Sequence, residues 1–352
     1  MAILLAACVT AFIIAFIALP VIIKYSLAKN LLDIPGRRKI HKKVTPSMGG
    51  IAIFIGFLMA VLTWMDFSEW ENIHFILASL FLIFLLGVRD DIVPFRATHK
   101  LYGQILAVFI LMFSSVRVNS LYGFLSIDVI PGPVTYILTG FAVILITNSF
   151  NLIDGLDGLA GSIGLVGLVA FGIWFFIADD LVFALLCFSM AGGILAFIIF
   201  NWEPSEIFMG DTGAMVIGML LATLAIHFTN INGNLPAVSK IRFSAPIAAA
   251  ASVLIIPLSD TLRIIILRMS RGQSPFSPDK SHIHHAIMRL GMTHSQTAII
   301  LGTVNVLFIV TVFLFRHLSD EIVLSGVVVV ALLLSVLLDR LIIRKVTIKA
   351  SS

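Results

Sequence analysis

Runs of apolar residues alternate with short polar segments from residue 2 to residue 343. Runs of roughly 16 to 22 apolar residues suit helices that cross a hydrocarbon layer, whereas barrel strands would show short alternating segments. The pattern therefore predicts an all-α, polytopic membrane protein. About 11 transmembrane helices are expected, at residues 2–23, 48–65, 75–88, 101–116, 134–150, 160–177, 181–200, 212–229, 243–258, 297–315 and 322–338.

Composition excludes a water-soluble protein. The chain has 352 residues, of which 59% are hydrophobic and 12% are charged, whereas soluble domains carry about 25% charged residues. Cys8 and Cys187 both lie inside apolar runs and lack CxxC spacing, so a disulfide framework or a thiolate metal site is not expected. No linker or repeat divides the chain, and residues 1–352 are predicted to form a single integral-membrane domain.

The basic residues indicate the orientation. If the N-terminus lies outside, 19 Lys and Arg residues fall on one side of the membrane and four on the other. The positive-inside rule then places the N-terminus outside and the C-terminus in the cytoplasm. No nucleic-acid partner is expected, because the net charge of +4 is spread over these membrane-flanking loops. The expected cytoplasmic loops are 24–47, 89–100, 151–159, 201–211 and 259–296.

Two adjacent carboxylates, Asp90 and Asp91, end an apolar run, and Lys100 follows nine residues later. Adjacent like charges at a membrane boundary need a cation partner, either a metal ion or a basic side chain, to stay ionised. The alternative is a solvated helix end.

Polar residues recur every three positions at Asn148, Asn151, Asp154 and Asp157. In a helix this spacing aligns the four side chains along one inclined stripe. The alternative is a structural stripe hydrogen-bonded inside the bundle, but two carboxylates and two amides exceed what packing needs in apolar surroundings.

A small-residue turn, Phe208 to Gly213, precedes another apolar run. Its carboxylate, Asp211, is a hard oxygen ligand of the kind that Mg²⁺ prefers, and the backbone N–H groups of the turn suit a phosphate. The alternative is that Asp211 or Thr212 is the N-cap of the following helix.

Three histidines, His282, His284 and His285, lie in the longest predicted cytoplasmic loop among Arg and Lys residues. They come without a second His or Cys cluster, so phosphate binding is favoured over a zinc site. A plain surface loop is the alternative.

Taken in order, five motifs resemble one known family. They are residues 32–41 with Gly49-Gly50, Asp90-Asp91, residues 148–158, residues 208–211 and residues 282–285. The chain resembles the polyprenyl-phosphate N-acetylhexosamine-1-phosphate transferases of bacterial envelope synthesis. Ile283 interrupts the run of three histidines that the muramoyl-pentapeptide branch carries unbroken. The pattern is more similar to the branch that transfers N-acetylglucosamine 1-phosphate to undecaprenyl phosphate at the start of O-antigen synthesis. Teichoic-acid initiators share it, so the pathway stays open.

The resemblance implies a magnesium-dependent transferase of the bacterial cytoplasmic (inner) membrane, with Mn²⁺ as an alternative ion. Its substrates would be a UDP-N-acetyl sugar, UDP-GlcNAc in the main interpretation, and undecaprenyl phosphate. Asp211 and Asn151 would coordinate the metal, Lys100 would neutralise phosphate charge, and Asp90 and Asp91 would lie beside the acceptor phosphate. Phe208 would lie against uracil, Asp154 and Asp157 would border the nucleoside, and the histidines would contact the phosphates. The full set of substrate-binding candidates is Asn148, Asp154, Asp157, Asn201, Phe208, His282, His284 and His285.

Three other interpretations are weighed. A cation transporter would carry its carboxylates near helix midpoints, whereas these map to helix ends. A scaffold would have no clustered acids. A transferase acting on another UDP-N-acetylhexosamine keeps the same chemistry. Whether the chain forms a homodimer is left open.

Overall fold

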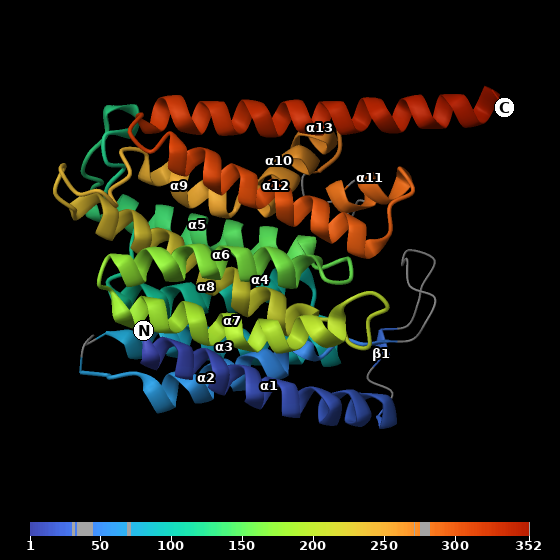
Figure 1. Cartoon of the computed structure of the whole chain (residues 1–352), viewed down its shortest axis with the longest axis horizontal. Coiled ribbons are helices and arrows are strands. Elements are labelled where there is room, and N and C mark those ends of the chain that lie inside the picture. The colour runs from blue at the N-terminus through green and yellow to red at the C-terminus, as the bar shows by residue number, and fades with distance from the viewer. Residues whose placement is uncertain (30–31, 34–44, 69–71, 271, 275–281, 352) are drawn as a thin grey trace.

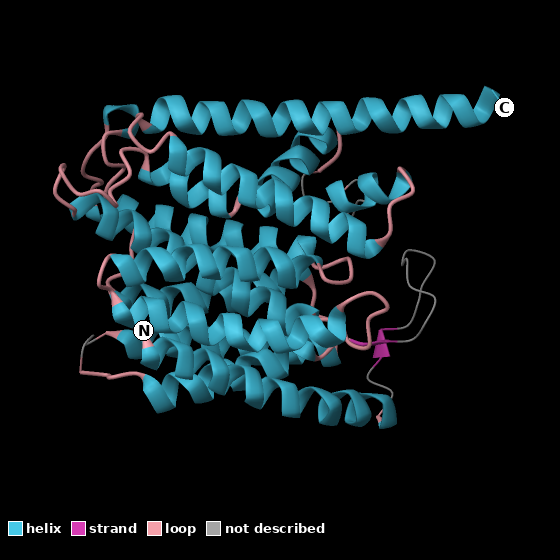
Figure 2. Ribbon diagram, in the orientation of Figure 1, coloured by secondary structure: helices cyan, strands magenta, loops and turns pink. Residues whose placement is uncertain are grey.

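The computed structural model describes residues 1–29, 32–33, 45–68, 72–270, 272–274 and 282–351, and it is a bundle of helices (Figure 1). The predicted all-α class is confirmed. In the described part of the chain, the only sheet pairs β1 (Leu32–Asp33) antiparallel with β2 (Thr45–Pro46) (Figure 2). Residues 34–41 of the first sequence motif lie outside the described residues.

The helices are α1 (Ala2–Ala28), α2 (Gly49–Trp64), α3 (Ile73–Ile92), α4 (Ala97–Leu111), η1 (Met112–Ser114), η2 (Phe124–Ser126), α5 (Gly132–Ile153), α6 (Leu159–Ile177), α7 (Leu181–Asn201), α8 (Gly210–Asn234), α9 (Pro246–Val253), α10 (Ile255–Ser270), α11 (Ile283–Arg289), α12 (His294–Leu314) and α13 (Asp320–Ser351).

Every apolar run in the sequence corresponds to helical structure. Within the described residues, nine helices are long and apolar enough to cross a membrane, or ten when the bent pair α9 and α10 is taken as one span. The apolar helix α2 has 16 residues and is shorter than this group. The structure thus shows a polytopic membrane protein, and the full count of eleven crossings stays a prediction.

The predicted ninth span, 243–258, is divided. Helices α9 and α10 meet at Leu254 with a bend of 85°. Pro257 lies in the first turn of α10 and has no backbone N–H, so the hydrogen-bond ladder cannot pass through it to the preceding turn. The bend turns α10 away from the direction of α9 and toward the predicted site.

Helix α8 lies at the centre of the bundle and packs against α2, α3, α5, α6 and α9. Most of its residues are buried, including every one from Thr212 to Phe228. It meets α2 at a small-residue contact, because a Cβ atom on Gly50 would lie 2.1 Å from the backbone nitrogen of Gly213. Small residues let membrane helices approach this closely, so the N-terminus of α8 is held firmly among its neighbours.

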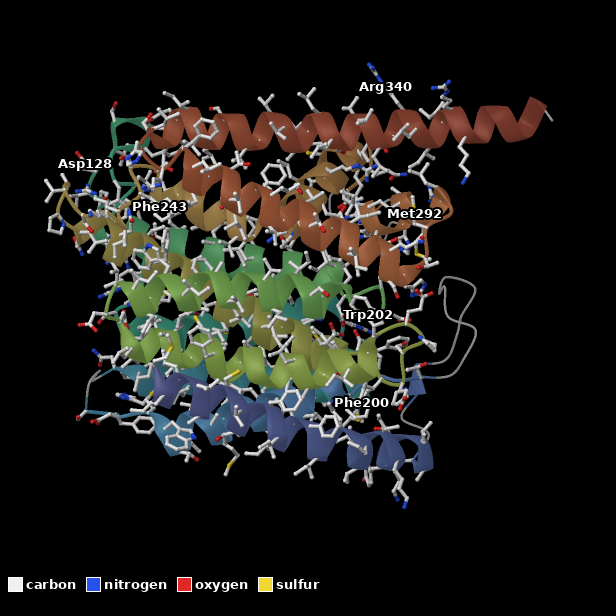
Figure 3. All side chains as sticks on the ribbon, viewed as in Figure 1. Asp128, Phe200, Trp202, Phe243, Met292 and Arg340 are labelled. Carbon is white, nitrogen blue, oxygen red and sulfur yellow. The ribbon has the colours of Figure 1, made fainter. Side chains whose placement is uncertain are left out.

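The bundle has two distinct ends. The N-terminus lies at the end where Asp128 and Phe243 are found, and the C-terminus lies beyond the end where Trp202 and Met292 are found (Figure 1 and Figure 3). The N-terminus of α8 is at the second of these ends. Helix α13 lies along the outside of the bundle and extends past it, and most of its apolar side chains are exposed.

Candidate functional site

Lys100 lies between two of the predicted carboxylates. Its Nζ atom is 2.5 Å from Oδ1 of Asp211 and 3.1 Å from Oδ2 of Asp90. Asp90 is in the last turn of α3, Lys100 in the first turn of α4, and Asp211 in the first turn of α8. The backbone N–H of Phe95 also donates to Asp90, at 2.5 Å. Asp90 therefore has the cation partner that the sequence predicted.

Asp91 has a different environment from its neighbour. Its carboxylate accepts hydrogen bonds from the backbone N–H of Asp211 at 2.8 Å, from the N–H of Thr212 at 3.1 Å and from the Thr212 hydroxyl at 2.5 Å. The alternative prediction that Asp211 or Thr212 is the N-cap of this helix is wrong, because Asp91 satisfies these free N–H groups from another helix. The Asp211 side chain is left to face Lys100.

Gly210 makes this arrangement possible. Its φ angle is +75°, and a Cβ atom there would lie 2.7 Å from Oδ2 of Asp91 and closer still to the Ser47 carbonyl oxygen. Only glycine combines this left-handed conformation with so close an approach. The glycine of the predicted turn therefore brings the carboxylate of Asp91 to the start of α8.

The end of α5 contributes an amide and a carboxylate. Asn151 hydrogen-bonds Asp211, and Asp154 accepts a hydrogen bond from the backbone N–H of Gly210. Asp154 follows the last residue of α5, and burial, together with the negative charges of Asp211 and Asp91, raises its pKa to about 8. Such a raised pKa is typical of clustered carboxylates. We define the carboxylate cluster as Asp90, Asp91, Asp154 and Asp211.

The polar stripe of α5 is only partly helical. Asn148 and Asn151 lie in α5, but the helix ends at Ile153, so Asp154 and Asp157 belong to the following loop. Asn148 pairs with Gln104 of α4 through two hydrogen bonds of 3.0 and 3.1 Å between their side-chain amides. Sequence reasoning missed Gln104. The sequence feature that could have indicated Gln104 is a single amide in an apolar helix, because such an amide needs a polar partner.

Asn201 supports the loop that carries Asp157. Its Oδ1 atom accepts from the backbone N–H of Gly158, its Nδ2 atom donates to the Ile207 carbonyl oxygen, both at 2.8 Å, and the residue is buried. These bonds indicate a structural role, and the predicted contact with substrate stays a prediction. Asp157 is buried 3.2 Å from Nδ1 of His294.

The predicted histidines lie together at α11. Nδ1 of His282 is 2.8 Å from Oδ2 of Asp260, whose Oδ1 accepts from the backbone N–H of Ile283 at 2.8 Å. The rings of His282 and His284 are nearly parallel, with centroids 5.7 Å apart, and those of His284 and His285 are 4.3 Å apart. Asp260 was another residue that sequence reasoning left out of the site. It is almost fully buried and orients this histidine group.

The histidine group reaches the carboxylate cluster through the α5–α6 loop. Nε2 of His284 would lie 3.0 Å from a Cβ atom on Gly155, the residue between Asp154 and Leu156. Burial, with the neighbouring His285, lowers the pKa of His284 to about 3, which keeps its imidazole neutral. The histidine group and the carboxylate cluster therefore lie in one continuous region at the end of the bundle.

The α7–α8 loop ties this region to the rest of the chain. Phe208 is half-buried, its N–H donates to the Pro46 carbonyl at 2.8 Å, and its own carbonyl accepts from Gly49 at 2.9 Å. In the same loop, the Glu203 carboxylate accepts from the N–H and hydroxyl of Ser295 at 2.8 and 2.9 Å. Trp202, a further residue not predicted, packs on Gly158. The loop thus joins β2, α2 and α12.

The donor set suits magnesium bound together with a substrate. In the described part of the chain, no group of three or more His, Cys, Asp or Glu is arranged to enclose a metal ion. Magnesium is usually held by one or two carboxylates plus substrate phosphates and water. Asp211 and Asn151 offer two such oxygen donors beside the other three carboxylates of the cluster, and Lys100 forms ion pairs with Asp90 and Asp211. The residues present fit a magnesium ion.

Comparison with known proteins decides the family. The model of glycosyl transferase family 4 matches residues 73–229. A Yersinia pestis protein named undecaprenyl-phosphate alpha-N-acetylglucosaminyl 1-phosphate transferase is 30% identical over 284 residues, which cover 79% of this chain and 75% of that protein. The chain belongs to glycosyl transferase family 4. This membership confirms the resemblance that the motifs indicated.

Other relatives of this family 4 member carry similar names. A Bacillus subtilis protein named "Probable undecaprenyl-phosphate N-acetylglucosaminyl 1-phosphate transferase" is 27% identical over 317 residues, covering 88% of this chain and 85% of that protein. An Escherichia coli K12 protein with the same name as the Yersinia relative is 30% identical over 285 residues, covering 77% and 73%. The matched family range contains the whole carboxylate cluster but ends before the histidine group.

Proposed function

We propose that this family 4 member transfers N-acetylglucosamine 1-phosphate from UDP-GlcNAc to undecaprenyl phosphate. The products are UMP and a lipid pyrophosphate sugar. The observation that carries the proposal is the position of Lys100 between Asp90 and Asp211, because an ammonium among carboxylates at a helix N-terminus suits a pyrophosphate and its cation. The names of the relatives support the same substrates.

Each substrate has a fitting approach to this cluster. UDP-GlcNAc is soluble and anionic, so it needs cationic and hydrogen-bonding groups, which Lys100 and the histidine group supply. The acceptor is a lipid, so the site must be open to the bilayer. The exposed apolar side chains Leu101, Tyr102 and Ile105 follow Lys100 along α4 and offer a surface for the polyprenyl chain.

The protein residues have distinct tasks in this proposal. Asp211 and Asn151 would hold Mg²⁺, or Mn²⁺, and the bound ion would neutralise charge on the transferred phosphoryl group. Phe208 lies against the uracil, and Asp154 and Asp157 border the nucleoside. His282, His284 and His285 contact the phosphates, and Asp90 faces the acceptor.

Transfer proceeds by direct attack in this account. An oxygen of the acceptor phosphate forms a bond to the β-phosphorus of UDP-GlcNAc, and the bond from that phosphorus to the bridging oxygen breaks, so that UMP leaves. The acceptor phosphate has a second pKa of about 6 and is mostly dianionic at neutral pH. It therefore needs only weak base assistance from Asp90.

A panel of donors tests the substrate assignment. The purified full chain is incubated with undecaprenyl phosphate, Mg²⁺ and one of several UDP-sugars, and UMP release is measured. UDP-GlcNAc is expected to give the largest kcat/KM. A preference for another UDP-N-acetylhexosamine would retain the chemistry and replace the donor, whereas release from none of them would contradict the proposal.

The site is proposed to face the cytoplasm of a bacterial inner membrane, with eleven crossings, the N-terminus outside and the C-terminus inside. The imbalance of 19 to 4 basic residues supports this orientation. Reporters fused after Ser352 and near Asn232 test it, because the first is expected in the cytoplasm and the second outside. A C-terminal reporter on the outside would contradict the map.

A further inference from the structure

A second polar region lies at the other end of the bundle. A cavity of about 460 Å³ is formed between the loop that follows α8 and the loop that joins α12 to α13. Helix α8 has 25 residues, so its rise of about 1.5 Å per residue separates this cavity from Asp211 by about 37 Å. The polar residues in its lining are Ser239, Lys240, Arg242, Ser244, Arg316 and His317.

The charge of this lining is opposite to the net charge that the sequence predicts for this side of the membrane. The orientation predicted from the sequence places four Lys and Arg residues and eight Asp and Glu residues on this side of the membrane. Three of the four cations, Lys240, Arg242 and Arg316, nevertheless line this one cavity. Repulsion between like charges opposes such a gathering unless an anion offsets it.

Backbone contacts hold the two guanidinium groups in place. Arg242 donates to the Leu235 carbonyl at 2.8 Å, and Arg316 donates to the Phe313 carbonyl at 3.2 Å, with its guanidinium 4.7 Å from the Phe313 ring centroid. The N–H of Ser244 donates to the Arg316 carbonyl at 2.8 Å, which joins the two loops. The two guanidinium groups are therefore fixed without using carboxylate partners.

The nearby acidic groups are engaged elsewhere. Among the described residues, no carboxylate forms an ion pair with Lys240, Arg242 or Arg316. Asp320 instead accepts from the backbone N–H groups of α9. The buried Nε–H of Arg316 has no hydrogen-bond partner in the described part of the chain. An anionic ligand is the partner that these donors lack.

We propose that this cavity binds a phosphate group. Two guanidinium groups, an ammonium and two serine hydroxyls match the charge and the several acceptor oxygens of a phosphate monoester or diester. The cavity also lies within the range of about 300 to 1,000 Å³ that is usual for small-molecule sites. The phosphate comes from an anionic phospholipid headgroup or from a soluble phosphate. This proposal does not depend on the transferase reaction.

Two measurements on the full chain distinguish the sources. Native mass spectrometry measures how much phosphatidylglycerol, relative to phosphatidylcholine, stays bound after extraction from a mixture of the two. Thermal unfolding in phosphatidylcholine nanodiscs measures stabilisation by sodium phosphate at constant ionic strength. The variants are Arg316→Gln and Lys240→Gln. Arg117→Gln is the matched control, because Arg117 is the fourth cation of this face, bonds Tyr136 and does not line the cavity.

Selective retention of phosphatidylglycerol, reduced about tenfold by either cavity variant and unchanged by the control, supports a headgroup site. Stabilisation by soluble phosphate with the same dependence on the variants, and no lipid preference, supports a site for free phosphate. Lys240→Gln keeps the test valid if Arg316→Gln fails to fold. Neither response in the wild type, or an equal response in all three variants, would overturn the proposal.

Discussion

The ammonium of Lys100 lies 2.5 Å from the carboxylate of Asp211, although 111 residues separate them along the chain. The contact joins the first turn of α4 to the first turn of α8 at the end of the bundle where Asp90 and Asp154 also lie. A cation among several carboxylates makes the region suitable for a metal ion with bound phosphates. The proposed phosphoryl transfer therefore depends on this pair.

Asp90→Asn and Asp91→Asn are expected to differ. Asp91 accepts three hydrogen bonds at the start of α8, so its substitution should lower stability by about 1 to 3 kcal/mol and reduce activity with it. Asp90→Asn keeps an acceptor for Phe95 but loses the charge facing Lys100, and should leave stability nearly unchanged. Thermal midpoints and kcat of both variants check this. Equal losses of both quantities in the two variants would contradict it.

Direct attack predicts a limited penalty for Asp90→Asn. Loss of weak base assistance should cost about 10² to 10⁴-fold in kcat, and part of the activity should return as pH rises, because the acceptor becomes fully ionised above its pKa of about 6. A covalent aspartyl-phosphate route would instead lose essentially all activity. The measurements are kcat against pH and UMP release without acceptor. A stoichiometric UMP burst in the absence of acceptor, missing in one Asp variant, would overturn direct attack.

Asp260→Asn should act through His282. The variant still accepts from the N–H of Ile283 but no longer fixes the imidazole as the carboxylate does. We expect KM for UDP-GlcNAc to rise about tenfold with a smaller change in kcat. Asp339→Asn is the control, because its carboxylate pairs with Arg263 on the same helix as Asp260. A similar KM change in the control, or an unchanged KM in Asp260→Asn, would show that Asp260 does not position the histidine.

His284 should make the fold sensitive to acid. Burial lowers its pKa to about 3, whereas the unfolded chain has a histidine pKa of 6.5. Between these values the unfolded state binds a proton that the folded state does not, so stability falls as pH falls below 6.5. The loss at pH 5 is about 2 kcal/mol. The measurement is the thermal unfolding midpoint of wild type and of His284→Gln between pH 7 and pH 5. An equal dependence of the midpoint on pH in the two proteins would contradict the prediction.

The hydrophobic pattern was sufficient to predict the helices but not their ends. The apolar run predicted that helix α3 ends at residue 88, but the helix continues to Ile92. Asp90 and Asp91 are therefore both helical, and their side chains point in different directions. Apolar runs report burial in a membrane, whereas the helix continues wherever backbone hydrogen bonds allow. The bend at Leu254 also follows from backbone chemistry at Pro257 and not from hydropathy.

Residue types predicted several of the side chains that the structure brings together, and the contacts between helices could not be predicted from them. Asp90, Asp154 and Asp211 could be chosen as candidates from their motifs, because carboxylates at a membrane boundary are costly without a partner. Sequence could not show that Asp91 caps a distant helix or that Asp260 orients His282, because both relationships depend on how separate helices pack.

The most direct test of the central claim compares wild type with Asp211→Asn in one assay containing UDP-GlcNAc, undecaprenyl phosphate and Mg²⁺. UMP and the lipid pyrophosphate sugar are quantified together, and Asp128→Asn, which changes an exposed carboxylate at the other end of the bundle, is the control. We expect equal amounts of the two products from wild type and control. Asp211→Asn, present in the membrane at the same level, should lose about 10³-fold or more. Near wild-type turnover of Asp211→Asn at saturating Mg²⁺ would contradict the account.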